Sequence, residues 1–177
     1  MIFDIKKRDE VTIIRFLKHN YKPVRKPSAK RFFREMRAMF PCRYQTITAE
    51  ELEDIILKTF GSNYSYYLLI SDEWFRTIPK TEMVKLLEKD DTETLNYIDV
   101  VADCDDFSDV LLGSLTRKTW NQGFAIGNLW YYTETFGHAV NLFIDDEKKV
   151  WIIEPQNDGI YEWGQGDYRG WAYMIKF

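Results

Sequence analysis

The sequence predicts an α+β protein in which N-terminal helices precede a C-terminal antiparallel β-sheet. Two observations lead to this prediction. Before residue 116, apolar residues recur at helical spacing, and beyond residue 119 they alternate with polar residues between turn signals. The chain has 177 residues, of which 45% are apolar and 16% aromatic. This composition is sufficient for the core of one domain, with or without an appendage.

Five segments are predicted to be helical from their apolar spacing and end signals. A short amphipathic helix is expected over 9–20, and a second over 29–40, which Ser28 caps and Pro41 ends. A third helix begins at the capping-box pair Thr48 and Glu51 and stops at Gly61. Helices over 79–89 and 104–115 follow. Together they place the helical part of the protein before its sheet.

Strands are predicted where β-branched and aromatic residues gather or alternate with polar ones. They cover residues 64–70, 124–131, 138–144, 150–153 and 171–177. The acidic segment 145–148 has the composition of a hairpin turn between the third and fourth of these strands. This turn would bring residue 138 close to residue 154.

Charge is distributed unevenly along the chain. Residues 1–50 carry a net +8 and residues 51–177 a net −12, giving −4 overall. The basic residues within 22–37 can bind nucleic acid, but a solvated face or docking onto the acidic part is more usual, and no nucleic-acid module is recognised. We therefore predict a basic helical segment, 1–43, followed by a domain, 44–177.

The compartment expected from the sequence is the cytoplasm. No apolar run is long enough to span a membrane, and the N-terminus does not have the pattern of a signal peptide. The two cysteines, Cys42 and Cys104, do not form a disulfide framework, so free thiols are expected. Cys42 is interpreted as structural and His19 as a surface residue.

Three residues in the second half of the chain have the chemistry of a thiol nucleophile, a base and an orienter of that base. Cys104 follows the N-cap candidate Asp103, His138 begins a predicted strand, and Glu154 ends another. Gln156 and Asn157 are alternatives for the orienting role. Each residue also has a plainer interpretation: a buried small cysteine, a core histidine, and a solvated acid at a strand end.

Acidic residues surround the candidate nucleophile, and their negative charge opposes formation of a thiolate. Acids are common in the first turn of a helix, where they favour the helix dipole. Oxygen-rich clusters can also bind a hard cation such as Ca²⁺, although the sequence contains no calcium-loop motif. The residues concerned are Asp103, Asp105, Asp106 and Asp109.

The motifs around Cys104, His138 and Glu154 together resemble the protease domain of the Marasmius oreades agglutinin family, which has small relatives in bacteriophages and bacteria. The resemblance covers roughly residues 44–160. It implies a papain-like fold, with the nucleophile helix packed on the sheet, and a dependence on calcium-type ions. It also implies Cys104 as nucleophile, His138 as base and Glu154 as orienter. Where papain-type enzymes place an oxyanion glutamine, this chain has Ile98.

The leading hypothesis is a cysteine peptidase that hydrolyses peptide or amide bonds in a peptide or protein substrate, without an organic cofactor. A papain-like amidase acting on cell-wall peptides is one alternative. A catalytically silent papain-like module that binds a host protein or nucleic acid is another. The sequence leaves the substrate and the oligomeric state open.

Overall fold

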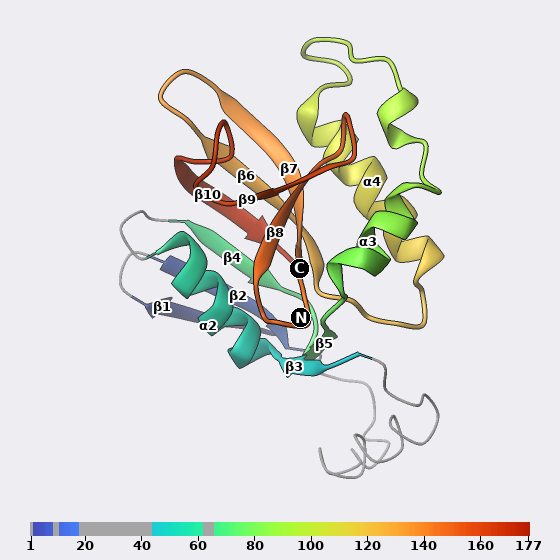
Figure 1. Cartoon of the computed structure of the whole chain (residues 1–177). Helices are drawn as coiled ribbons and strands as arrows, with labels where there is room; N and C mark the ends of the chain where they lie inside the picture. Colours follow the sequence, from blue (N-terminus) through green and yellow to red (C-terminus); the bar gives the residue numbers. More distant parts are fainter. Residues whose placement is uncertain (1, 9–10, 18–43, 62–65) are drawn as a thin grey trace.

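The computed structural model describes residues 2–8, 11–17, 44–61 and 66–177 (Figure 1). A mixed sheet of eight strands dominates this part of the chain, in the order β1-β2-β4-β10-β6-β7-β8-β9. Its strands are β1 (Ile2–Arg8), β2 (Val11–Leu17), β4 (Tyr67–Ile70), β6 (Ile126–Tyr132), β7 (Gly137–Ile144), β8 (Val150–Glu154), β9 (Gly159–Glu162) and β10 (Trp171–Lys176). A small second sheet pairs β3 (Thr46–Thr48) with β5 (Trp74–Arg76).

Three α-helices lie within the described ranges, together with one short 3₁₀ turn. The helices are α2 (Ala49–Phe60), α3 (Lys80–Leu87) and α4 (Cys104–Lys118), and the turn is η1 (Thr92–Thr94). The Thr48–Glu51 capping box is confirmed, since Thr48 N donates to Glu51 at 2.9 Å and Glu51 N to Thr48 Oγ1 at 3.0 Å. The helices predicted at 79–89 and after Asp103 are confirmed as α3 and α4.

The predicted fold class is wrong. The protein is mostly β-sheet, and its large sheet is not the C-terminal antiparallel sheet of the predicted papain-like arrangement, because it includes strands from both ends of the chain. The helix expected over 9–20 is replaced by β2, which forms an antiparallel hairpin with β1. Thr12, Ile13 and Ile14 are β-branched, and only Ile13 of the three is fully buried, as alternation in a strand requires.

Two strand pairings make the sheet mixed. β4 runs parallel to both β2 and β10, whereas β10, β6, β7, β8 and β9 pair antiparallel in succession. The helix predicted over 29–40 lies outside the described residues, so the division of the chain at residue 43 stays a prediction. The basic residues 22–37, His19 and Cys42 lie outside them as well.

Successive residues of β7 face two separate cores. Leu142 belongs to a cluster that includes α2, whereas Phe143 belongs to a second cluster built with α3 and α4. The alternation of a strand places such neighbours on opposite faces of the sheet. In Figure 1, α2 and α4 accordingly lie on different sides of the central strands.

Polar side chains hold α4 on its face of the sheet. Asn141 Nδ2 donates to Ser108 O at 2.9 Å, and Asn128 Nδ2 donates to Ser108 Oγ at 2.9 Å. Asn128 and Asn141 are register partners on β6 and β7, and both are fully buried. Because Ser108 lies one helical turn after Cys104, these bonds fix the height of the helix N-terminus against the strands.

Candidate functional site

Cys104 is the first residue of α4 and is partly exposed. Asp103 occupies the N-cap position, and its backbone N donates to Asp106 Oδ2 at 3.2 Å. The first backbone N–H groups of a helix have no partner within the helix, and the helix dipole favours negative charge there. The sulfur therefore lies in the part of α4 that best stabilises a thiolate or an oxyanion.

His138 lies near the start of β7 and connects Cys104 to Glu154. Its Nε2 atom is 2.8 Å from Glu154 Oε2, and its ring also hydrogen-bonds to Cys104. Burial lowers the pKa of His138, but the hydrogen bonds to Cys104 and Glu154 outweigh this effect and raise it to about 9. Near neutral pH the imidazole is therefore protonated and lies between two groups that can be anionic.

Glu154 is well placed to orient His138. It ends β8, and its side chain is only 8% exposed. Tyr168 Oη donates to the same Oε2 atom at 3.3 Å, and Gln156 N donates to Oε1 at 3.3 Å. Gln156 thus contributes its backbone, whereas Asn157 Oδ1 accepts from Gly159 N at 2.8 Å in the turn that leads to β9.

Two aromatic rings enclose the imidazole. The ring centroids of Tyr131 and Phe136 lie 5.8 Å and 6.1 Å from that of His138, both in edge-on arrangements. Tyr131 is fully buried, and its hydroxyl donates to Asp167 O at 3.1 Å. These contacts restrict the ring of His138 and connect β6 to the loop between β9 and β10.

The acidic residues near Cys104 separate into two groups. Asp106 accepts from the backbone of Asp103, and Asp109 Oδ1 accepts from Asn128 Nδ2 at 2.8 Å, so both are engaged within the protein. The side chains of Asp103 and Asp105 converge with Cys104, their potential ligand atoms lying within 4.8 Å of one another. A hydrogen bond between the two carboxyl groups, aided by burial, raises the pKa of Asp105. Two close carboxyl groups of this kind fit a hard cation.

The sequence did not indicate the contributions of Tyr131, Tyr168 and the two asparagines. Asn128 and Asn141 were detectable in principle, since each is a polar residue inside an apolar strand. Tyr168 gave no such signal because it lies in a Gly-rich segment, and the strand β9 before it was not predicted.

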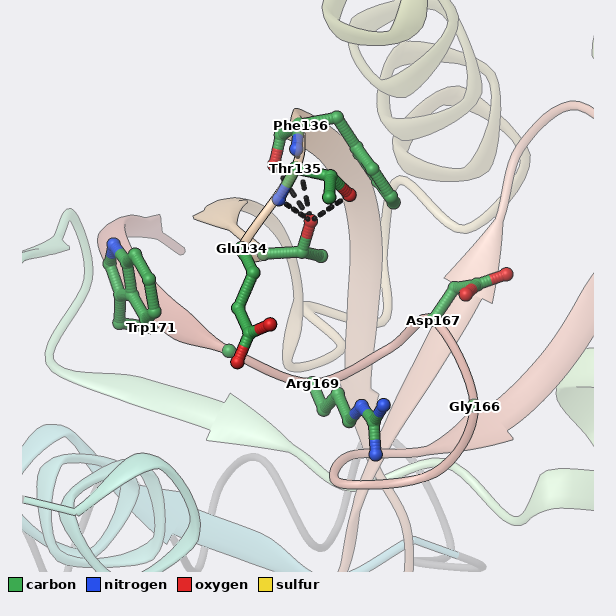
Figure 2. A pocket seen from close by; sticks show the side chains of 9 residues that line it. Glu134, Thr135, Phe136, Gly166, Asp167, Arg169 and Trp171 are labelled. Carbon is green, nitrogen blue, oxygen red and sulfur yellow. Dashed lines mark hydrogen bonds between the residues drawn. The ribbon is translucent and has the colours of Figure 1, made fainter.

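A hollow of about 610 Å³ lies beside this group of residues (Figure 2). The β6–β7 hairpin and the loop before β10 form its walls, and Figure 2 shows Glu134 between Trp171 and Arg169. Phe136 and Asp167 also line it, and both adjoin the surroundings of His138. The hollow therefore shares Phe136 with the surroundings of His138, and its lining is both polar and aromatic.

The comparisons with known proteins give a likeness in structure. No family model and no curated protein matches the chain. A structure titled "PSL1a-E64 complex" superposes with a TM-score of 0.64 at 20% identity, covering 75% of this chain and 51% of that chain. The Polyporus squamosus lectin bound to a human-type influenza-binding epitope, Neu5Aca2-6Galb1-4GlcNAc, gives 0.62 at 21% identity, covering 75% and 49%.

These neighbours correct the class predicted from the sequence. One of the two structures is a lectin bound to a carbohydrate epitope, whereas the sequence predicted a hydrolase of the papain-like thiol protease class. The chain spans about half the length of the structures it matches, and the low identity establishes a shared fold only. Among the described residues, no helix is both long and apolar enough to cross a membrane. Three quarters of this chain therefore shares its fold with part of each of these two structures.

Proposed function

We propose that Cys104 is the nucleophile of an acyl-transfer enzyme, with His138 as its proton carrier and Glu154 as the orienter of His138. The observation that supports this proposal is that one imidazole hydrogen-bonds both to the thiol and to a buried carboxylate. A structural cysteine does not need a base, and a core histidine does not need both partners. The resemblance to the agglutinin protease domain stays a prediction consistent with this arrangement.

The reaction follows from the positions of the protons. The Cys104 thiolate attacks the carbonyl carbon of an amide or ester, and a C–S bond forms. His138 gives its proton to the departing nitrogen or oxygen as the carbonyl–heteroatom bond breaks, which leaves an acyl thioester. An acceptor such as water then loses a proton to His138, attacks the thioester carbonyl and releases the acyl group and the thiolate.

The start of α4 supplies a donor for the negative oxygen that forms during attack. The backbone N–H of Cys104 is one of the first in the helix, and such groups stabilise an oxyanion when they are directed at it. Ile98 cannot replace a glutamine donor. We assign the oxyanion to this helix terminus.

A calcium-type cation is part of the proposal through Asp103 and Asp105. Bound there, the ion would supply positive charge next to the thiolate, which the two carboxylates otherwise oppose. Asp106 and Asp109 are not included, because the protein already uses both side chains in hydrogen bonds.

The test is the rate at which iodoacetamide alkylates Cys104 at pH 7, read by peptide mass with Cys42 as an internal reference. An ordinary thiol is only a few per cent ionised at this pH, so losing the groups that activate it lowers the rate by up to roughly thirtyfold. We expect such a loss in His138→Ala and a smaller one in Glu154→Gln. If Cys104 of the wild type reacts no faster than Cys42, the proposed nucleophile is refuted.

Carbohydrate binding is a second candidate function, which the hollow beside His138 and the lectin neighbour favour. The indole of Trp171 offers an apolar face for the C–H side of a sugar ring, and Glu134 and Arg169 offer polar groups for its hydroxyl or carboxylate groups. The hollow has the size of a small-ligand pocket, about 300–1,000 Å³.

This candidate is tested by titrating the protein with Neu5Acα2-6Galβ1-4GlcNAc and with the asialo disaccharide, using calorimetry. Binding that Trp171→Ala abolishes, and that Trp120→Ala leaves unchanged, supports the hollow as the sugar site. Trp120 is a suitable control because it is 78% exposed and does not line the hollow. If the wild type binds neither glycan, this function is excluded for both ligands.

A further inference from the structure

One oxygen of Glu154 accepts two hydrogen bonds. His138 Nε2 lies 2.8 Å from Oε2, and Tyr168 Oη lies 3.3 Å from the same atom. Because Glu154 is buried, its charge is poorly shielded by water, and each donor reduces the negative charge that the other experiences. Tyr168 therefore adjoins the imidazole–carboxylate pair through its hydrogen bond to Glu154.

The surrounding structure holds Tyr168 in this position. Its ring stacks on that of Tyr161, with centroids 4.2 Å apart and planes 20° apart. Its backbone N donates to Gln165 O at 3.0 Å and its O accepts from Gly164 N at 2.7 Å, so the loop before β10 is closed on itself. The Tyr131 hydroxyl fixes the preceding residue of the same loop. The phenol thus approaches Glu154 from an ordered loop.

We propose that Tyr168 is a positioning residue, which fixes the Glu154 carboxylate and limits the negative charge that this carboxylate presents to His138. This inference rests on the proposed function, because it matters only if His138 transfers protons. An imidazolium that is held too strongly cannot release its proton to a leaving group, so a second donor on Glu154 makes His138 a better acid.

The groups that face His138 come from several elements. α4 provides Cys104, with Asp103 and Asp105 beside it, and β8 provides Glu154. On the remaining sides lie the phenols of Tyr131 and Tyr168. Burial is the largest cause that raises the pKa of both phenols, and the negative charge of Glu154 is the second. Both phenols therefore stay neutral donors across the pH range in which His138 titrates.

The test is the titration of His138, followed by NMR of protein labelled with ¹³C at histidine. The chain has two histidines, so His19 supplies an internal reference signal. Tyr168→Phe keeps the ring that stacks on Tyr161 and removes only the hydroxyl. We expect the midpoint of His138 to rise by roughly half a pH unit, which corresponds to the loss of a fraction of one hydrogen bond. An unchanged or lowered midpoint would overturn the proposal.

Two further variants separate this effect from a general structural change. Tyr66→Phe is the matched control, because Tyr66 is buried and its hydroxyl has no hydrogen-bond partner among the described residues. In a Glu154→Gln background, Tyr168→Phe should leave the midpoint in place, because Tyr168 acts through Glu154. A shift of equal size in that background would contradict this coupling.

Alkylation of Cys104 in the same samples separates the two proposals. A reactive Cys104 together with an unmoved His138 midpoint in Tyr168→Phe refutes the role of Tyr168 and leaves the proposed function standing. A wild-type Cys104 without enhanced reactivity refutes the proposed function, and the inference about Tyr168 falls with it.

Discussion

The protonation of His138 should make the stability of the protein depend on pH in a specific window. The folded pKa is about 9, whereas the ordinary value is 6.5. Between these values the folded protein holds a proton that the unfolded chain does not, so the unfolding free energy falls as the pH rises, by about 1.4 kcal/mol per pH unit. The stabilisation that the protonated His138 provides is complete below pH 6.5 and is lost by pH 9. The side chain is 17% exposed, so about 2–3 kcal/mol is a reasonable total.

The assay is urea unfolding of the wild type and of His138→Ala from pH 6 to pH 9.5, with the difference in unfolding free energy plotted against pH. Titrating groups that do not contact His138 cancel in this difference to first order, and the expected slope holds where Cys104 keeps its proton in both the folded and the unfolded state. We expect the advantage of the wild type to shrink by about 2–3 kcal/mol between pH 6.5 and pH 9. If the difference is constant across this range, His138 is not a stabilised imidazolium, and the inferred electrostatics of the site are wrong.

Three further predictions concern the frame around the site. Burial raises the pKa of Asp90, but hydrogen bonds from Lys118, Ser114 and Thr92 outweigh it and lower this pKa to about 2. We therefore expect Asp90→Ala to lower the unfolding free energy by about 3 kcal/mol in urea at pH 7. This loss should fade as the pH falls from 3.8 toward 2. Gly170 has a φ of 131°, and a Cβ there would lie 2.0 Å from Tyr132 O, so Gly170→Ala should lower the unfolding free energy by more than about 2 kcal/mol in the same assay. Val100 has a φ of 63° and is 83% exposed, so Val100→Gly should relieve strain and raise the stability by about 1 kcal/mol; a lower Tm in this variant would contradict the strain.

The middle and end of the chain were predictable because their signals are local. The Thr48–Glu51 capping box and the alternation along β7 each determine structure within a few residues. The N-terminal hairpin was not predictable in this way. The apolar residues around Ile13 fit both a helical and a strand period, and the parallel pairing of Thr12 with Tyr67 decides between them. That pairing crosses more than fifty residues, so local spacing could not reveal it.

The candidate site was likewise predictable in part from local signals. The order of Cys104, His138 and Glu154 and the turn over 145–148 were sufficient to predict that these residues meet, and the structure brings them together. The acidic cluster could not be interpreted from spacing, because neighbouring acids have different roles. Asp106 binds backbone and Asp109 binds Asn128, whereas Asp103 and Asp105 remain near the sulfur.

The contact between Cys104 and His138 needs an explanation, since the two residues belong to different faces of the sheet. By alternation His138 shares the face of Val140 and Leu142, which pack in the core with α2, whereas α4 packs on the opposite face. His138 is only the second residue of β7, and Cys104 is the first residue of α4. Only a side chain near the end of a strand can extend past the edge of the sheet and contact a helix on the other face. The hydrogen bond from Asn141 to Ser108 holds the helix against the strands, so this buried amide helps to fix the position of the Cys104 thiol one helical turn away.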